Sequence, residues 1–557
     1  MSYIFIQTKE IIMQIKLTRS LVNIAIVLGL SSSAFAAKVP EGTVLAEKQE
    51  IIINNGSEPA SFDPQRIEGV PESQVAYQLF EGLITKDEEG KLQAGVAESW
   101  QSSPDYKTWT FKLRQNAKWA NGEPVTAHDF VYAWQRLANP LTASPYASYL
   151  TYLQVENAQE IIDGKKKPEE LGVKAVDDYT LVLSLTNPVP YANELTTHAS
   201  LLPVNKKVVE QFGDSWAKKA NLVGNGAYKL VEHVINEKIV FERNSNYWND
   251  KETVINKATY LAIPNATTDV ARYKAGDLDV TNYTLPPEQF AKLKKDLPEE
   301  VFTARTLSTY LYEMNLNKKP FDDLRVRKAL NLALDRTIIT DKVLGQGQTP
   351  TYVFTPTYIH EGQKIQSPEY SQQTMTERNA QAIKLLEEAG FSKANPLKFS
   401  ILYNTNDNHK KIAIAAASLW KANTKGLVQV ELENQEWKTY LDTRREGKYD
   451  LARAGWSADY NQASTFVTYF LSDSSNNKTG YASKAYDEAV AESYKATDAE
   501  GRATAYAKAE KVLADDYAIV PIYNYVNPRL VKPYVKGYSG KDPQDDILLR
   551  NLYILKH

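Results

Sequence analysis

No Gly/Ser-rich or Pro-rich linker interrupts this chain of 557 residues, and no internal repeat or low-complexity tract divides it. A chain of this length is expected to form about two to four domains. Domains without linkers must share the chain, which then passes between them more than once. The sequence therefore predicts interleaved lobes rather than independent domains arranged in a row.

Local patterns indicate a mixture of strands and helices. Apolar and polar residues alternate, as in strands, over 109–113 and 181–185. Helix signals cover 127–137 (capped by Thr126), 324–336, 376–389 (closed by Gly390) and two segments within 483–515. These elements follow no strict βαβ order, so we expect mixed sheets.

The N-terminus has the layout of a cleaved secretory signal. Lys16 and Arg19 precede the apolar run 21–30, and small residues surround Ala36. The run is shorter than the ~20 residues that span a bilayer. We predict a signal peptide over 1–36, with Met13 as an alternative translation start. The mature chain is then exported to the periplasm.

The chain contains no cysteine and has a net charge of −3. An exported protein without disulfides must be stabilised by its core, which a chain of this length can provide. Without a cysteine there is no lipid anchor after the signal. The charge gives no support for a nucleic-acid partner, which requires a basic face.

The motifs of common enzyme classes are missing from the sequence. There is no G-x-S-x-G elbow, no phosphate-binding loop and no cysteine nucleophile. The six histidines do not fall at metal-ligand spacing. We therefore predict no catalytic residues, no metal and no cofactor, although a hydrolase with paired acids stays open.

Residues 449–461 carry the densest set of candidate binding groups. The run 449–452 has the apolar character of a strand, and Arg453, Trp456 and Asp459 follow it. A cation and an anion beside aromatic rings can hold a small zwitterion, with Asp459 facing an ammonium group and Arg453 facing a carboxylate. The alternative interpretation is a solvated turn with a surface ion pair, which contributes little.

Several segments together resemble the peptide/nickel class of periplasmic solute-binding proteins, and in particular its oligopeptide-binding branch. The resemblance covers 37–557 and is carried by L-F-E-G-L-I-T (79–85), A-G-V-A-E-S-W (94–100), the run 109–134, N-G-A-Y-K-L (225–230), F-E-R-N-S-N-Y-W (241–248), the run 320–336, N-Q-E-W-K-T-Y-L-D-T-R (434–444) and 449–461.

This resemblance implies an α/β fold of the two-lobed periplasmic binding protein type (type II-like, with mixed sheets). An additional domain is expected, with the ligand enclosed between the lobes. The implied boundaries are lobe one from 37–81, 206–307 and 519–557, the additional domain from 82–205, and lobe two from 308–518.

The resemblance also implies a function. Members of the branch bind short peptides in an extended conformation, largely independently of side-chain sequence, and deliver them to an inner-membrane ABC permease. We expect a monomer without cofactor. A receptor of the same fold for haem or another non-peptide nutrient is the alternative, and an enzyme is a third possibility.

Site residues are carried over by motif. Asp459 is expected to bind the peptide ammonium group, and Arg453 and His409 the carboxylate. The remaining positions implied to line the cleft are Glu68, Val70, Tyr146, Tyr283, Thr284, Trp437, Leu441, Arg444, Arg445, Gly455, Trp456, Ser457, Asn476 and Tyr525.

Some of these positions depart from the family pattern, and some have alternative interpretations. Leu344 stands where relatives carry a lysine, Arg445 where they carry a histidine, Tyr283-Thr284 where they carry two asparagines, and Ser457 where they carry a cysteine. From the residues alone, Trp437 and Tyr146 could be core aromatics, His409 a surface histidine and Asn476 part of an ordinary polar loop.

Overall fold

The computed structural model of the protein describes residues 37–557. The predicted signal peptide, 1–36, lies outside the described residues. Within residues 37–557, no helix combines the length and the apolar character needed to cross a membrane.

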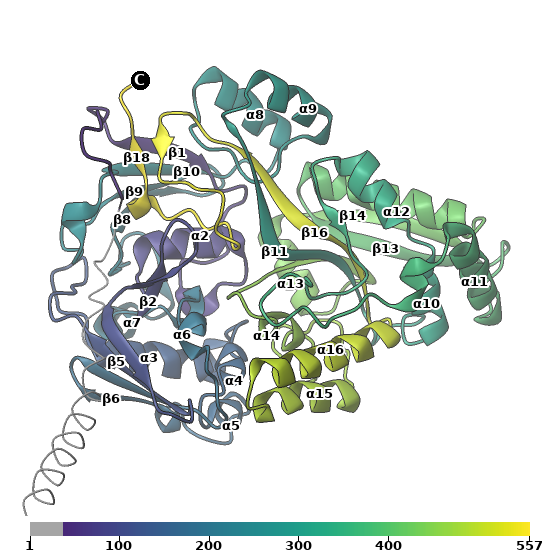
Figure 1. The fold of residues 1–557 in the computed structure, drawn as a ribbon, viewed down its shortest axis with the longest axis horizontal. Helices are drawn as coiled ribbons and strands as arrows, with labels where there is room; N and C mark the ends of the chain where they lie inside the picture. Colours follow the sequence, from purple (N-terminus) through teal and green to yellow (C-terminus); the bar gives the residue numbers. More distant parts are fainter. Residues whose placement is uncertain (1–36) are drawn as a thin grey trace, which may run out of the picture. The chain divides into compact units, whose positions relative to one another are not determined.

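Two four-stranded sheets are formed mainly by the first half of the described chain (Figure 1). In spatial order, the first contains β1 (Glu50–Asn54), β10 (Lys257–Leu261), β9 (Lys238–Arg243) and β8 (Tyr228–Val234). The second contains β4 (Ala97–Ser102), β5 (Thr108–Leu113), β7 (Thr180–Ser184) and β6 (Val173–Asp177). β1 pairs in parallel with β10, so the chain returns to the first sheet after building the second.

A six-stranded mixed sheet is formed by the second half. Its spatial order is β12 (Thr349–Pro350), β16 (Ile519–Leu530), β11 (Val301–Met314), β15 (Leu451–Ser457), β13 (Leu397–Asn404) and β14 (Val428–Gln435). The short pairs are β2 (Ile84–Lys86) with β3 (Leu92–Ala94) and β17 (Val535–Lys536) with β18 (Tyr553–Ile554).

β11 and β16 are two long neighbouring strands near the middle of the drawing (Figure 1). Their antiparallel register is irregular between Arg305 and Thr309. On one side of this break β11 pairs only with β16, and on the other side it also pairs with β15. These two strands therefore connect the six-stranded sheet to the remainder of the described chain.

The main helices are α2 (Val70–Leu79), α3 (Ala127–Ala138), α7 (Lys206–Phe212), α8 (Ala266–Ala275), α9 (Pro287–Asp296), α10 (Leu324–Leu332), α11 (Met375–Glu388), α12 (Asp407–Asn423), α13 (Trp437–Arg445), α15 (Lys484–Lys495) and α16 (Ala499–Asp515). Shorter helices are α4 (Tyr149–Tyr152), α5 (Ala158–Ile162), α6 (Ala192–Leu195) and α14 (Ser464–Val467).

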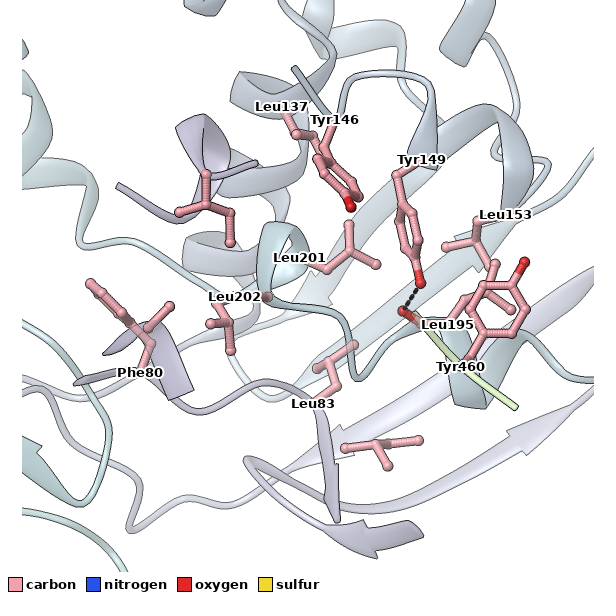
Figure 2. Close-up of a cluster of buried hydrophobic side chains, with 14 of the residues drawn as sticks. Phe80, Leu83, Leu137, Tyr146, Tyr149, Leu153, Leu195, Leu201, Leu202 and Tyr460 are labelled. Atoms are coloured by element: carbon pink, nitrogen blue, oxygen red, sulfur yellow. Dashed lines mark hydrogen bonds between the residues drawn. The ribbon is translucent and has the colours of Figure 1, made fainter. Parts of the chain in front are cut away.

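A buried apolar cluster supports the aromatic residues beside the second sheet (Figure 2). The Tyr149 hydroxyl donates to the Leu195 carbonyl at 3.0 Å, which satisfies its polar end inside the core. Tyr146 is also buried in this cluster. The positions of both rings are therefore fixed by packing, which matters for the site described below.

Most predicted elements are present, with two differences. The helix predicted over 324–336 ends at Leu332, and a separate π-helical segment follows over Ile338–Leu344. Asp335, between the two, accepts from the Thr337 N–H at 3.0 Å at the start of the second segment. The predicted strand at 449–452 instead begins at Leu451 and continues to Ser457, because its pairing with β11 extends that far. Arg453 thus lies within the strand. Thr126 is the N-cap residue of α3 as predicted, although its side chain makes no capping hydrogen bond; instead Asp129 accepts from the Thr126 N–H at 2.8 Å.

Candidate ligand-binding site

A cavity of about 240 Å³ lies among segments that are far apart in the sequence. Two further cavities measure about 10 Å³ each, too small for any ligand beyond water. All the residues predicted for the site line the large cavity except Arg445: Glu68, Val70, Tyr146, Tyr283, Thr284, His409, Trp437, Leu441, Arg444, Arg453, Gly455, Trp456, Ser457, Asp459, Asn476 and Tyr525.

One edge of β15 borders this cavity. β13 pairs with β15 only at Leu451 and Ala452. Among the described residues, the stretch from Arg453 to Ser457 therefore has β11 on one side and no strand on the other. Most of this stretch lines the cavity. An unpaired strand edge is a template for adding another extended chain.

Asp459 supplies a free anionic oxygen to the cavity. Its side chain is only 7% exposed. Oδ1 lies 3.3 Å from the Nε2 atom of His198, and Oδ2 has no hydrogen-bond partner among the described residues. A buried carboxylate oxygen without a partner is costly. Asp459 is therefore a buried carboxylate with one unpartnered oxygen, and it is not part of a solvated turn.

His198 holds Asp459 in place. The backbone N–H of Ser200 donates to His198 Nδ1 at 3.2 Å, and the other ring nitrogen, Nε2, faces Asp459. The ring is stacked on Tyr146 at 4.7 Å and on Tyr149 at 4.5 Å between ring centroids. The sequence analysis missed His198, because nothing in the surrounding segment distinguishes it from an ordinary buried histidine.

Arg453 supplies the cation. Its guanidinium donates to the Tyr525 hydroxyl and, at 3.4 Å, to the Asn404 side chain, both of which are neutral. Its Nε has no partner, and it forms no ion pair with a described carboxylate. It also lies over the Tyr310 ring at 5.0 Å. The surface ion pair between Arg453 and Asp459, the alternative interpretation of this segment, does not form.

His409 lies in the first turn of α12, close to Arg453. Burial and the positive charge of Arg453 lower the pKa of His409 well below its usual value, so the imidazole is neutral. Its Nδ1 has no partner among the described residues. His409 is therefore buried, not a surface histidine, and it offers a neutral polar group to the cavity.

Gly455 gives Arg453 and Tyr525 the space they occupy. A Cβ at this position would lie 3.0 Å from Arg453 Nη2 and 3.0 Å from the Tyr525 hydroxyl oxygen. Only glycine leaves both groups undisturbed at the exposed middle of β15.

The predicted aromatic residues and Asn476 also have defined partners. Trp437 Nε1 donates to Glu72 at 3.0 Å, and Trp456 Nε1 donates to the Thr465 carbonyl at 2.9 Å. Trp456 is stacked on Tyr146 at 6.1 Å. Asn476 is buried and lines the cavity, so it is not an ordinary solvated loop residue.

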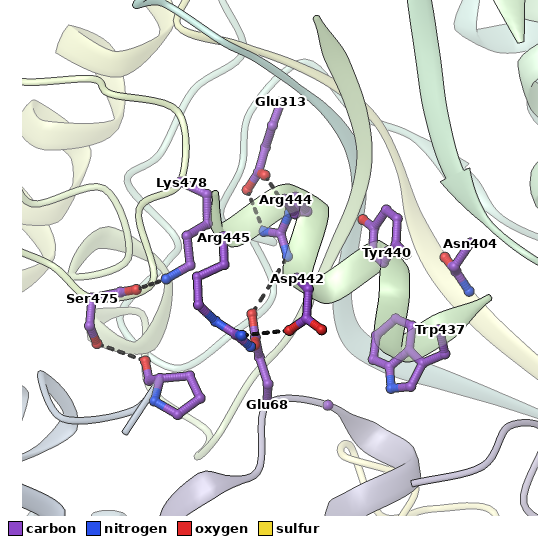
Figure 3. A network of polar contacts seen from close by, with 12 residues as sticks. Glu68, Glu313, Asn404, Trp437, Tyr440, Asp442, Arg444, Arg445, Ser475 and Lys478 are labelled. Atoms are coloured by element: carbon purple, nitrogen blue, oxygen red, sulfur yellow. Dashed lines mark hydrogen bonds and ion pairs between the residues drawn. The ribbon is translucent and has the colours of Figure 1, made fainter. Parts of the chain in front are cut away.

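A network of charged residues joins two residues of the cavity wall, Arg444 and Glu68, to residues outside that wall (Figure 3). Arg444 donates to Glu313 at 2.8 and 3.0 Å, and Glu313 is fully buried. Arg445 does not line the cavity; it donates at 2.6 Å to Glu68, which does. Arg445 is the one predicted site residue that the structure places outside the cavity wall, because its side chain on α13 extends to Glu68 from the solvent side.

Two further residues that sequence reasoning missed shape the site. Gln544 Nε2 donates to the carbonyls of Ala458 and Asp459 at 2.9 and 2.7 Å, which fixes the backbone around the anion. Glu72 accepts from the Ala60 N–H at 2.6 Å as well as from Trp437. Neither residue lies in a local pattern that indicates a binding role.

Within the described residues, no group of His, Cys, Asp or Glu is placed to hold a metal ion. The cavity instead combines one available anionic oxygen, one available guanidinium, a neutral histidine, an open strand edge and aromatic walls. This arrangement fits a solute that has both charges and an extended backbone.

The family description "Bacterial extracellular solute-binding proteins, family 5 Middle" matches residues 91–478. The chain belongs to this family. It has the α/β fold of the family's periplasmic binding proteins, with multiple mixed sheets. Family membership identifies a solute-binding protein and not an enzyme.

Similar proteins match over nearly the whole chain. The periplasmic oligopeptide-binding protein OppA of Haemophilus influenzae is 73% identical, over 96% of this chain and 98% of the relative. A crystal structure of that species' OppA in complex with RPPGFSPFR has a TM-score of 0.91 at 74% identity and covers 92% of this chain and 100% of the other.

Two structures of murein tripeptide-binding proteins named MppA are also similar, each at 46% identity, and the first of them is the Escherichia coli protein. One has a TM-score of 0.90 and covers 92% of this chain and 100% of the other. The other, an unliganded open form, has a TM-score of 0.64 and covers 93% of this chain and 99% of the other.

Proposed function

We propose that the protein is a periplasmic receptor that captures short peptides and delivers them to an inner-membrane ABC permease. The observation that carries the proposal is that two oppositely charged groups line one cavity and that each has an atom without a hydrogen-bond partner. Asp459 Oδ2 is available for an ammonium group, and Arg453 is available for a carboxylate. A free peptide has one of each.

The open edge of β15 supports an extended binding mode. A peptide lying along Arg453–Ser457 would extend the sheet by backbone hydrogen bonds. Backbone groups are common to all peptides, so affinity would depend little on side chains, which enter the wider, hydrated parts of the cavity. The peptide in the H. influenzae relative supports the same ligand class.

The same proposal includes closure by a hinge. The register break in β11 falls at 305–309, next to the boundary predicted at 307–308 between the lobes, and β16 runs alongside it. The structure of this chain is more similar to one MppA structure, with a TM-score of 0.90, than to the unliganded open form of MppA, with a TM-score of 0.64. This difference supports an equilibrium between open and closed states. The three predicted domains and a monomeric state belong to this proposal.

The periplasmic location of the protein is part of the proposal as well. It is supported by the names of the relatives and by the signal pattern over 1–36. We do not propose haem as a ligand, because the OppA and MppA relatives described above are named for binding peptides.

Calorimetry with tri- to pentapeptides that differ only in their side chains tests the proposal. We expect binding within about two decades across the panel, a spread of about 2.8 kcal/mol. Native mass spectrometry of gently purified protein should show co-purified peptides. A single tight binder among otherwise inert peptides would contradict the extended mode, and a panel without any binder would contradict the peptide proposal itself.

A further inference from the structure

The carboxylate of Glu68 in the cavity wall is neutralised by a residue outside that wall. Glu68 lines the cavity, and its side chain is 10% exposed. Arg445 Nη2 donates to Glu68 Oε2 at 2.6 Å. The Arg445 side chain is 43% exposed and does not line the cavity. Its position therefore allows it to act on the charge of the wall without touching a ligand.

The other cations near Glu68 are occupied elsewhere. Arg444 Nη1 is 4.0 Å from Glu68 Oε1, but its guanidinium is held by the buried Glu313. Lys478 donates its ammonium protons to the Ser475 carbonyl (Figure 3). Asp442 holds Arg445 from the other side at 2.8 Å. Arg445 is thus the only cation among the described residues that hydrogen-bonds to Glu68.

We propose that Arg445 is a specificity-determining residue that sets the charge preference of the cavity by neutralising Glu68. With Arg445 in place, the wall at Glu68 accepts uncharged ligand side chains. Without it, the carboxylate in this largely buried position would require a cation from the ligand. The inference rests on the proposed function, since it concerns the side chains of bound peptides.

A structural alternative makes a different prediction. Glu68 and Arg445 come from distant parts of the chain, so their ion pair also joins α13 to the segment before α2. If the pair only holds these segments together, its loss would weaken all peptides by the same factor. If it sets charge preference, its loss would change the ratio between charged and uncharged peptides.

The test uses Arg445→Gln and tripeptides in which lysine or norleucine is placed at each position in turn. Norleucine has a similar length and no charge. Calorimetry should show that the substitution raises the lysine-to-norleucine affinity ratio about tenfold at one position. Arg445→Lys, which retains the cation, should keep the unmodified ratio. The double variant Glu68→Gln/Arg445→Gln should lose the gain.

Glu68→Gln alone provides an independent variant. It removes the negative charge of the wall while Arg445 stays paired with Asp442, so the lysine-to-norleucine affinity ratio should fall rather than rise at that position. Ratios that stay unchanged at every position, or equal losses for all peptides, would overturn the inference. If the unmodified protein binds none of the tripeptides, the proposed function fails instead, so the two failures can be distinguished.

Discussion

The Asp459 carboxylate is divided between a protein partner and an open position: Oδ1 lies 3.3 Å from His198 Nε2, and Oδ2 is unpartnered. His198 is itself fixed by the Ser200 N–H and by stacking on two tyrosines. One oxygen is therefore held beside His198, and the other is the atom that we propose binds the ligand ammonium group. This relationship links the core of Figure 2 to the binding site.

His198→Ala should weaken peptide binding about five- to hundredfold, because Asp459 Oδ1 would be buried without a partner in the closed complex, at a cost of about 1–3 kcal/mol. In the open state, water can replace His198 as the partner of Oδ1. The free-energy cost therefore appears only in the closed complex and weakens binding. His198→Gln, which can offer an N–H to Oδ1, should recover much of the affinity. Calorimetry compares the three proteins; equal binding by His198→Ala and the unmodified protein would show that His198 does not orient Asp459.

Gly455→Ala should weaken recognition of the peptide carboxylate, because the new Cβ would lie 3.0 Å from Arg453 Nη2 and displace it. We expect peptides with a free carboxylate to lose about tenfold in affinity, while peptide amides change little. Ser457→Ala on the same strand is the control and should keep the discrimination against amides. Equal losses for acids and amides would mean that Gly455 serves backbone packing alone.

Asp269→Asn should remove a pH dependence of stability. Burial raises the pKa of Asp269 to about 7, while Oδ2 accepts from the Asn282 N–H at 2.9 Å. An acid whose folded pKa is raised binds its proton more tightly when folded. Its contribution to the free energy of unfolding therefore falls as pH rises from about 4 to about 7.

The asparagine variant keeps the acceptor without the charge. It should be more stable than the unmodified protein by on the order of 3 kcal/mol at pH 8, and the difference should shrink toward pH 4. Urea unfolding at both pH values measures this difference, with the exposed Asp277→Asn as control. A difference that does not vary with pH would contradict a buried, raised carboxyl at 269.

Ligand binding should make the molecule more compact. If β11 and β16 carry a hinge, a tripeptide shifts the equilibrium toward the closed form, because only in that form does the peptide contact both lobes. Small-angle scattering should show a smaller radius of gyration with saturating tripeptide. Trp437→Phe, which loses the hydrogen bond to Glu72, should need more peptide for the same change. An unchanged radius at saturation would contradict the hinge.

The sequence singled out residues that line the cavity, but not the contacts that hold those residues in place. Asp459 and Arg453 lie in 449–461, one of the segments that carry the family resemblance, and His409 was carried over with its own local motif, 402–411. The partners of the site residues could not be carried over. His198 and Gln544, which contact Asp459, and Glu72, which contacts Trp437, come from segments distant in sequence that only tertiary packing brings together. No local pattern encodes such contacts.

The limits of local patterns also explain the differences in the fold. The strand at 449–452 was placed too early because its pairing with β11, which continues to Ser457, is a long-range property. The helix from 324 ends at Leu332, and a second helical segment begins beyond Asp335, whose side chain accepts from the Thr337 N–H. Likewise, the charged character of Arg445 was visible in the sequence, but its position behind Glu68 required the structure.

The most direct test of the central claim is a double cycle between Asp459→Ala and N-acetylation of the peptide. Converting Asp459 to alanine leaves the ligand ammonium buried and unpaired, at an expected cost of about 3–5 kcal/mol, or roughly a hundredfold to several thousandfold in affinity. Acetylated peptides should bind the unmodified protein poorly, because they lack the charge that Asp459 neutralises. The account predicts strongly non-additive losses when both changes are combined. Additive losses would show that Asp459 does not bind the ammonium group and would contradict the account.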